Sequence, residues 1–174
     1  MTRLPTLPTY LDAMQQLLAF TLQIPPVDPS TSLRVTFLLR LTGDLMSSIP
    51  GYPPHIKDLP QLLEFFDDLD QAWLAVLKSQ IWDPESGEGV DLVVPIDAID
   101  AGKPTMTSSP MNQTERTRLR SLLVTGTASL EEWLTGLDVA GEDYQLALER
   151  TGMQQKMGSF EGVINDPAGM EGTC

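Results

Sequence analysis

The stretch that decides the fold is residues 58–82, DLPQLLEFFDDLDQAWLAVLKSQIW, which carries the clearest apolar repeat in the chain. Its large apolar residues recur every three or four positions, so they predict one face of a helix of about six turns. Asp58 is a good N-cap, and Pro60 suits the first turn because its missing N–H costs little there. The apolar face consists of Leu59, Leu62, Leu63, Phe66, Leu69, Trp73, Leu77 and Ile81.

Three other segments show the same periodicity and predict three further helices. The first runs from about Thr9 to Gln23, and the second follows the cap-rich stretch 28–32 and reaches Ile49, with Phe37 widening its apolar face. The last begins near Asn112, where Glu115 stands at the capping-box position. Gly126 falls on the apolar stripe of this last helix, which predicts either a close approach to a neighbour or a kink.

The remaining segments connect or extend these helices. Prolines and glycines in residues 83–110 predict a long irregular connection, with an extended segment between Val90 and Ile99. A short fifth helix is expected at about 142–150, and residues 153–174 are predicted to form a flexible tail. The fold class is therefore predicted to be all-α, with residues 1–152 forming a single domain. Its four amphipathic helices bury their apolar faces most simply in a bundle, whose order of directions stays open.

Charge and composition narrow the class of protein. The 174 residues carry 24 acidic and 11 basic side chains, a net charge of −13 that disfavours nucleic acids and anionic membranes as partners. A single cysteine cannot form an intrachain disulfide, which favours a reducing compartment. No run of 18 apolar residues and no secretion signal is recognised, so the sequence predicts an intracellular protein, cytoplasmic or nuclear, without a membrane span.

Scarcity of histidine and cysteine limits the chemistry available. His55 and Cys174 are the only residues of these types, so a Ser–His or Cys–His pair and a zinc site are both disfavoured. The acidic run 83–91 fails as a calcium loop because Glu88 occupies the position that requires glycine. Gly102-Lys103 likewise lacks the rest of a phosphate-binding loop. We therefore predict no catalytic residue, no metal site and no cofactor.

Two groups of residues are candidates for partner binding. Glu64, Asp67 and Asp68 lie in the acidic run of the 58–82 helix, where a solvated face is the simplest interpretation and binding of a basic partner is the functional one. Trp82, Val93 and Val94 lie at and after the end of the helical apolar repeat, and they predict an apolar patch that a partner covers.

The leading hypothesis is a non-enzymatic protein–protein interaction or adaptor subunit of an intracellular assembly. A second hypothesis is an acidic escort or inhibitor that binds a basic protein partner through Glu64, Asp67 and Asp68. A third, less favoured, is an enzyme that uses paired carboxylates for acid–base chemistry. A protein partner is expected, and a homo-oligomer is as compatible with a spare apolar patch as a hetero-complex is.

Overall fold

The computed structural model describes residues 5–91 and 110–137. Its four α-helices are α1 (Leu7–Leu22), α2 (Ser30–Ser48), α3 (Leu59–Leu77) and α4 (Gln113–Leu134). Single-turn 3-10 helices η1 (Ile49–Gly51) and η2 (Ile56–Asp58) join α2 to α3, and strands β1 (Ile81–Asp83) and β2 (Glu88–Val90) form an antiparallel hairpin after α3. The mainly helical prediction is confirmed. The hairpin is a small departure from the all-α class.

Several sequence predictions fall on other parts of the chain. The predicted fifth helix at 142–150, the tail at 153–174 and residues 92–99 of the expected extended segment lie outside the described residues. Within residues 83–91 the expected break from helix is present as the hairpin.

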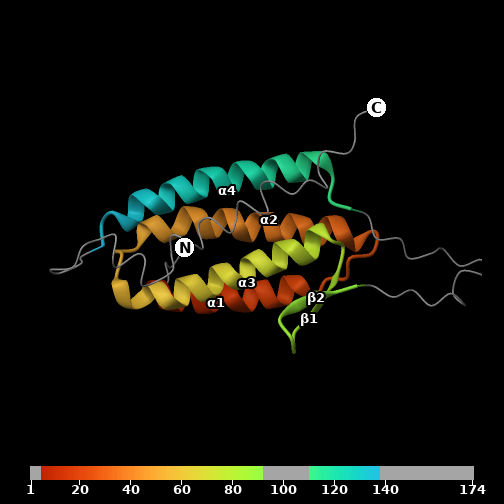
Figure 1. Cartoon of the computed structure of the whole chain (residues 1–174), viewed down its shortest axis with the longest axis horizontal. Coiled ribbons are helices and arrows are strands. Elements are labelled where there is room, and N and C mark those ends of the chain that lie inside the picture. The colour runs from red at the N-terminus through yellow and green to blue at the C-terminus, as the bar shows by residue number, and fades with distance from the viewer. Residues whose placement is uncertain (1–4, 92–109, 138–174) are drawn as a thin grey trace, which may run out of the picture.

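Successive helices run in alternating directions (Figure 1). Tyr10, near the start of α1, donates a hydrogen bond to the backbone carbonyl of Asp44, near the end of α2, so these two helices are antiparallel. Trp133, near the end of α4, donates to the carbonyl of Tyr52, which follows α2, so α4 is parallel to α2. The order of directions that the sequence left open is therefore up-down-up-down.

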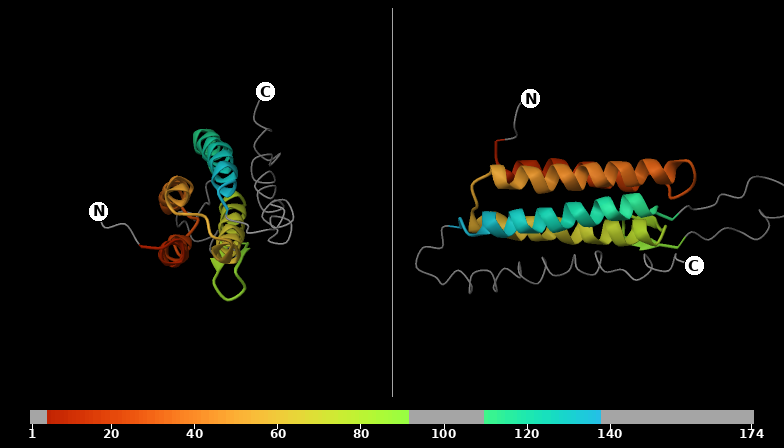
Figure 2. Two further views of the ribbon diagram at one scale, coloured as in Figure 1. Left: turned by 90° about the vertical axis from the view of Figure 1, so that its left-hand side faces the viewer. Right: turned by 90° about the horizontal axis from the view of Figure 1, so that it is seen from above.

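The end-on view shows which helices are neighbours (Figure 2). Helix α1 contacts both α2 and α3, and α2 also contacts α4. The hairpin lies against α3, mainly through β2. Helix α1 is thus flanked by one helix on each side, and its two flanks can be compared directly.

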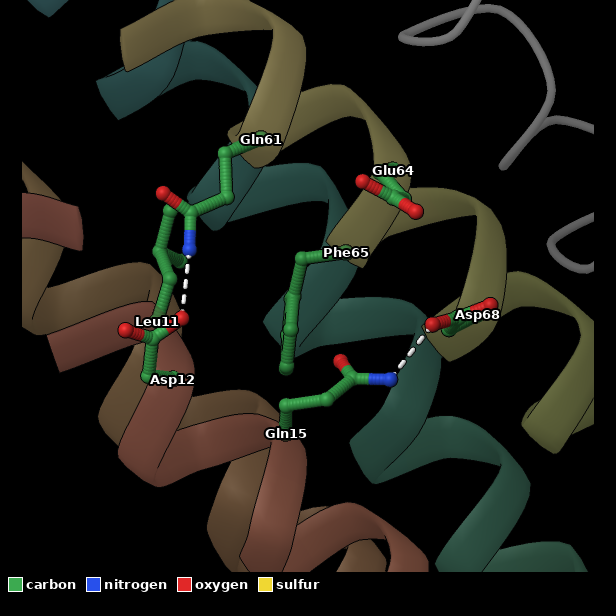
Figure 3. Close-up of a pocket in the computed structure, with 7 residues that line it drawn as sticks. All are labelled: Leu11, Asp12, Gln15, Gln61, Glu64, Phe65 and Asp68. Atoms are coloured by element: carbon green, nitrogen blue, oxygen red, sulfur yellow. Dashed lines mark hydrogen bonds between the residues drawn. The ribbon is translucent and has the colours of Figure 1, made fainter. Parts of the chain in front are cut away.

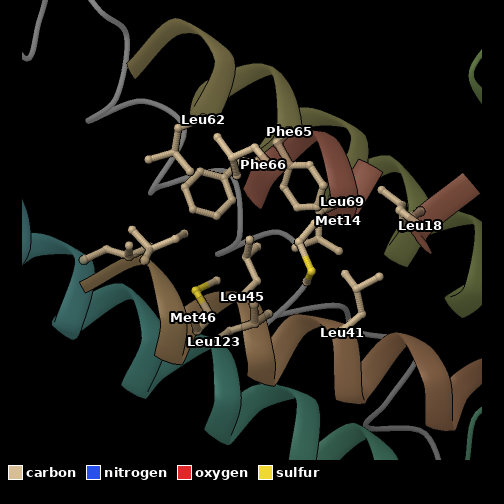
Figure 4. Close-up of a cluster of buried hydrophobic side chains, with 14 of the residues drawn as sticks. Met14, Leu18, Leu41, Leu45, Met46, Leu62, Phe65, Phe66, Leu69 and Leu123 are labelled. Atoms are coloured by element: carbon tan, nitrogen blue, oxygen red, sulfur yellow. The ribbon is translucent and has the colours of Figure 1, made fainter. Parts of the chain in front are cut away.

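A leucine-rich core lies between the helices (Figure 4). Trp73 of α3 is fully buried, and its ring N–H donates to the hydroxyl of Thr42 at 3.1 Å, so the one polar atom of the indole is satisfied. Each fully buried leucine or phenylalanine contributes about 1.5–3 kcal/mol relative to an exposed one, which makes this core the main source of stability.

The ends of two helices differ from the sequence prediction. Helix α3 ends at Leu77 rather than near Ile81, because Ser79 adopts a positive φ of 56° and the chain turns into β1. Ile81 is therefore an exposed strand residue and not part of the α3 apolar face. Helix α1 begins at Leu7, two residues before the predicted Thr9, because the hydroxyl of Thr6 accepts the N–H of Thr9 and caps the helix.

Asp58 and Phe37 also differ from expectation. Asp58 occupies the N-cap position of α3, but its side chain makes no capping hydrogen bond, and its helical backbone continues the turn of η2. Phe37 was expected to widen the buried face of α2, yet 48% of its surface is exposed. It lies at the outer margin of that face, where α1, α3 and α4 leave it largely uncovered.

Helix α4 confirms both predictions made for it. Asn112 and Glu115 form the capping box, with each side chain accepting the other residue's backbone N–H. Gly126 is buried against α2, where a Cβ at this position would lie 2.6 Å from Cγ of Met46. The glycine therefore permits a close approach of two helices, and the helix continues through it without a break.

Candidate functional site

A cleft of about 190 Å³ lies between α1 and α3 (Figure 3). Its lining includes Glu64 and Asp68, two of the residues predicted to bind a partner, and Asp12 from the facing helix. The buried ring of Phe65 points from α3 toward α1 between these polar groups. The residues that line the cleft are Leu11, Asp12, Gln15, Gln61, Glu64, Phe65 and Asp68.

Two hydrogen bonds cross the cleft and join the helices. Gln61 of α3 donates from Nε2 to Oδ1 of Asp12 at 2.7 Å, and Gln15 of α1 donates from Nε2 to Oδ2 of Asp68 at 2.5 Å. Each helix thus supplies one amide donor and one carboxylate acceptor. Asp12 and Gln15 are one turn apart on α1, and Gln61 and Asp68 are two turns apart on α3. Each pair therefore lies on the side of its helix that faces the other helix.

The arrangement favours binding of a positive group over acid–base catalysis. Asp12, Glu64 and Asp68 concentrate negative charge at the cleft, which attracts cations, but two of these carboxylates already accept an amide N–H. The chain's one histidine, His55, is not among the lining residues. Among the described residues, no group of three or more acidic, histidine or cysteine side chains is placed to hold a metal ion.

Asp67 and Asp70 lie on a different flank of α3 from the cleft. Neither lines it, because a helix turns about 100° per residue and these positions point away from the Gln61–Asp68 edge. Partial burial raises the pKa of the Asp70 carboxyl, and one of its oxygens is buried without a hydrogen-bond partner in the described residues. The structure therefore brings Glu64 and Asp68 together and separates Asp67 from them.

Trp82 occupies the middle of β1 and is partly buried against the core. It pairs in register with Gly89 of β2, and a Cβ on that glycine would lie 2.7 Å from Cβ of Ala75 on α3. Trp82 is thus partly exposed and also packs the hairpin against the helices. Val93 and Val94, its predicted companions, lie outside the described residues.

The turn of this hairpin is organised by a single aspartate. A hydrogen bond from the backbone N–H of Glu85 lowers the pKa of the Asp83 carboxyl, and the hydroxyl of Ser86 donates to its second oxygen at 2.9 Å. Gly87 then adopts a positive φ of 69°, which glycine reaches without strain. The acidic run that failed as a calcium loop therefore has a local structural role in the turn.

Helices α1 and α2, which contact each other, both carry large exposed apolar side chains that the sequence patterns did not indicate. Four large apolar side chains are between 48% and 67% exposed there, and we refer to them as the α1/α2 surface. Phe20 is the most exposed of them. Its residues are Leu17, Phe20, Leu33 and Phe37. One signal in the sequence could have located it: residues 13–27 contain no charged side chain in a chain of net charge −13.

Arg34 of α2 is a buried cation that reaches the segment after α3. Only 1% of its surface is exposed, and its Nη1 donates to the backbone carbonyl of Gln80 at 2.7 Å. Within the described residues Nε and Nη2 have no hydrogen-bond partner. Burial lowers the pKa of this guanidinium to about 10, so the side chain is still charged at neutral pH. A buried charge with so few partners is costly to stability.

The chain was compared with known protein families, curated proteins and solved structures. It matches none of them. No helix in residues 5–91 and 110–137 is long and apolar enough to cross a membrane.

Proposed function

We propose that this chain is a non-enzymatic interaction protein, a four-helix bundle that serves as an adaptor subunit in an intracellular assembly. The observation that supports this proposal is the α1/α2 surface, where Leu17, Phe20, Leu33 and Phe37 are exposed together. Single exposed apolar residues are common on monomers, but a contiguous group with aromatic members is typical of an interaction site.

The composition around this surface supports the same function. Cores of protein–protein interfaces are depleted in charged residues and enriched in aromatic ones. Residues 13–27 have no charged side chain, and between residues 29 and 39 the one charged residue is Arg34, which is buried. In a strongly acidic chain, this local neutrality favours contact with an apolar protein surface.

Capture from a lysate of the source organism, washed at low and high salt, tests the proposal. The bait is the full chain, compared with Leu17→Gln/Phe20→Gln, and Val124→Gln on α4 is the control because Val124 is also 53% exposed. We expect a stoichiometric partner that survives high salt and is lost with the double variant alone. Glutamine adds no charge and favours helix, so loss of binding is not an effect of charge or of helix unfolding.

A partner that binds the double variant as well as it binds the natural chain would contradict this function. Circular dichroism and thermal melting of both variants provide the necessary check on folding. Retention by the folded double variant would move the interaction site elsewhere on the molecule.

The cleft between α1 and α3 supports a second candidate, an acidic escort or inhibitor of a basic protein. Asp12, Glu64 and Asp68 converge there, and exposed charges of this kind are screened within about 8 Å at physiological ionic strength. Binding through the cleft would therefore weaken steeply with salt and with Glu64→Gln/Asp68→Asn. A partner insensitive to both changes would exclude the escort function. A carboxylate-based enzyme is the least favoured candidate, because Asp70 lies apart from Glu64 and Asp68.

A further inference from the structure

The four residues of the α1/α2 surface form one contiguous group across two helices. The hydrogen bond from Tyr10 to the carbonyl of Asp44 fixes the antiparallel register. Moving seven residues forward along α1 and seven back along α2 brings Leu17 level with Phe37. A further turn along each helix brings Phe20 level with Leu33. Seven residues are about two turns, so Leu17 and Phe37 keep the orientation toward the neighbouring helix that Tyr10 and Asp44 have, and each helix contributes one leucine and one phenylalanine at matching levels. The α1/α2 pair forms one side of the molecule (Figure 2).

The exposed apolar area supplies about half of what a standard dimer contact buries on each partner. With exposures of 53%, 67%, 49% and 48%, the four residues together present an area of about 450 Å². A standard interface buries about 800 Å² per partner, of which the apolar centre is only a part. The neutral neighbours on both helices, such as Gln16 and Thr36, are exposed and would supply the polar rim.

Charge decides which partner fits this surface. Two copies of a chain with net charge −13 repel each other, so they can approach closely only where carboxylates are absent. The α1 half of the surface is such a place, since residues 13–27 carry no charge, and on α2 the nearest carboxylate, Asp44, is paired with Arg40. A basic partner, in contrast, would find near this surface only Asp44, which already pairs with Arg40, while the cleft on the other flank of α1 offers three carboxylates.

The pattern is also self-complementary. An isologous contact uses the same patch on both copies, so each side must match itself. Because both helices present a leucine and a phenylalanine, apolar side chains meet apolar ones whichever helix of one copy lies against which helix of the other. We propose that the α1/α2 surface binds a second copy of this chain and forms a twofold-symmetric homodimer. This inference rests on the proposed function and names the partner of the same surface.

Analytical ultracentrifugation of the purified full chain tests the dimer directly. We expect the mass to rise from 19.1 kDa toward twice that value between about 1 and 300 µM protein, with a dissociation constant on the order of 10 µM. Raising NaCl from about 50 to 500 mM should tighten the dimer severalfold, because salt screens the repulsion between like-charged copies. Tightening with salt separates this contact from the binding of a basic protein.

Matched variants assign the contact to the surface. Leu17→Gln/Phe20→Gln should weaken dimerisation at least about 30-fold, since exposed aromatic anchors carry much of the binding energy in such interfaces. Val124→Gln on α4 should change the dissociation constant by less than about twofold. Thermal melting shows that each variant is folded.

Three outcomes would overturn the inference. A chain that stays monomeric up to about 300 µM at both salt concentrations does not use this surface for a second copy. A dimer that the double variant leaves intact forms through another face. A monomeric chain whose lysate partner is nevertheless lost with the double variant would leave the proposed function standing and refute the homodimer alone.

Discussion

Helix α1 has two flanks of opposite character, one bridged to a neighbouring helix by hydrogen bonds and the other largely exposed. Toward α3, Gln15 and Gln61 bridge the helices through two carboxylates, and the ring of Phe65 is 97% removed from solvent, its exposure being 3%. Toward α2, Leu17 and Phe20 remain largely exposed. The first flank satisfies its own groups within one chain. The second leaves apolar area exposed to water.

The contrast arises from the positions of side chains on one helix. Asp12 and Gln15 lie on the α3 side of the buried stripe, whereas Leu17 and Phe20 lie on the α2 side. A polar edge can close over a core because its hydrogen bonds replace those with water. An apolar edge exposed to water gains nothing until it is buried, so it favours association.

The largest expected effect comes from making the same substitution on each flank. Phe65→Ala should lower the free energy of unfolding by about 3–5 kcal/mol, because it removes a buried ring and leaves a cavity. Phe20→Ala should change it by no more than about 0.5 kcal/mol in the monomer. Urea denaturation at low protein concentration measures both. Equal losses at the two positions would mean that the α1/α2 flank is as closed as the α1/α3 flank.

The buried Arg34 of α2 provides the next test of stability near the α1/α2 flank. Arg34→Met should raise the free energy of unfolding by about 1–3 kcal/mol, because it replaces a poorly partnered buried cation with an apolar side chain of similar length. Burial lowers the pKa of this group to about 10, so below pH 10 the cost of the charge is fully present, and stability recovers only as the pH rises above 10.

Arg40→Met on the same helix is the control for this prediction. Arg40 is exposed and pairs with Asp44 at 2.8 Å one turn away, and such surface pairs contribute about 0.5 kcal/mol. Thermal melting at pH 7 compares the two variants. A loss of stability in Arg34→Met larger than in Arg40→Met would show that the buried guanidinium is better satisfied than its contacts suggest.

Two glycines at the junction of α2 and α4 allow a further comparison of packing. Gly126→Ala should cost about 1–3 kcal/mol, since its Cβ would meet Cγ of Met46 at 2.6 Å and force that side chain to move. Gly43→Ala should stabilise by up to about 1 kcal/mol, because its Cβ would lie 3.5 Å from Leu122 and alanine favours helix. Opposite signs in chemical denaturation would confirm that only the first glycine marks a close approach.

The smallest effect is expected at the hydrogen bonds of the α1/α3 flank. Gln15→Ala should lower the free energy of unfolding by about 0.5–1 kcal/mol, since it removes the donor to Asp68. Gln16→Ala, on the adjacent exposed position, should change it by a few tenths at most. If the two variants were equally stable, the hydrogen bond across the cleft would add nothing to stability. The contact between α1 and α3 would then be stabilised by the burial of Phe65 instead.

Local patterns in the sequence predicted most of the helices well. The apolar repeat of 58–82 located α3, and the Asn112–Glu115 capping box located the start of α4, because both depend on residues within one or two turns. The end of α3 was placed four residues too late. Ile81 continues the apolar spacing, and the turn at Ser79 that removes it from the helix carries no strong sequence signal.

The partner-binding residues were harder to predict. Glu64, Asp67 and Asp68 were predicted as one group, but only Glu64 and Asp68 line the cleft. That these two face Asp12 and two glutamines depends on which helix lies beside α3. Phe37 was assigned to the buried face because an apolar residue near the stripe is usually covered. Leu17 and Phe20 belong to a surface only in combination with α2, and no property of α1 alone shows this.

The sequence by itself determined the helical periodicity, the breaks at proline and glycine, the acidic excess and the lack of most nucleophilic and metal-binding side chains. These depend on residue types and short spacings. Tertiary structure alone decided that α1 lies between α2 and α3, that Arg34 is buried, and that one flank of α1 is bridged while the other is exposed. Those outcomes depend on which helices become neighbours, and that is set by packing between residues distant in the chain.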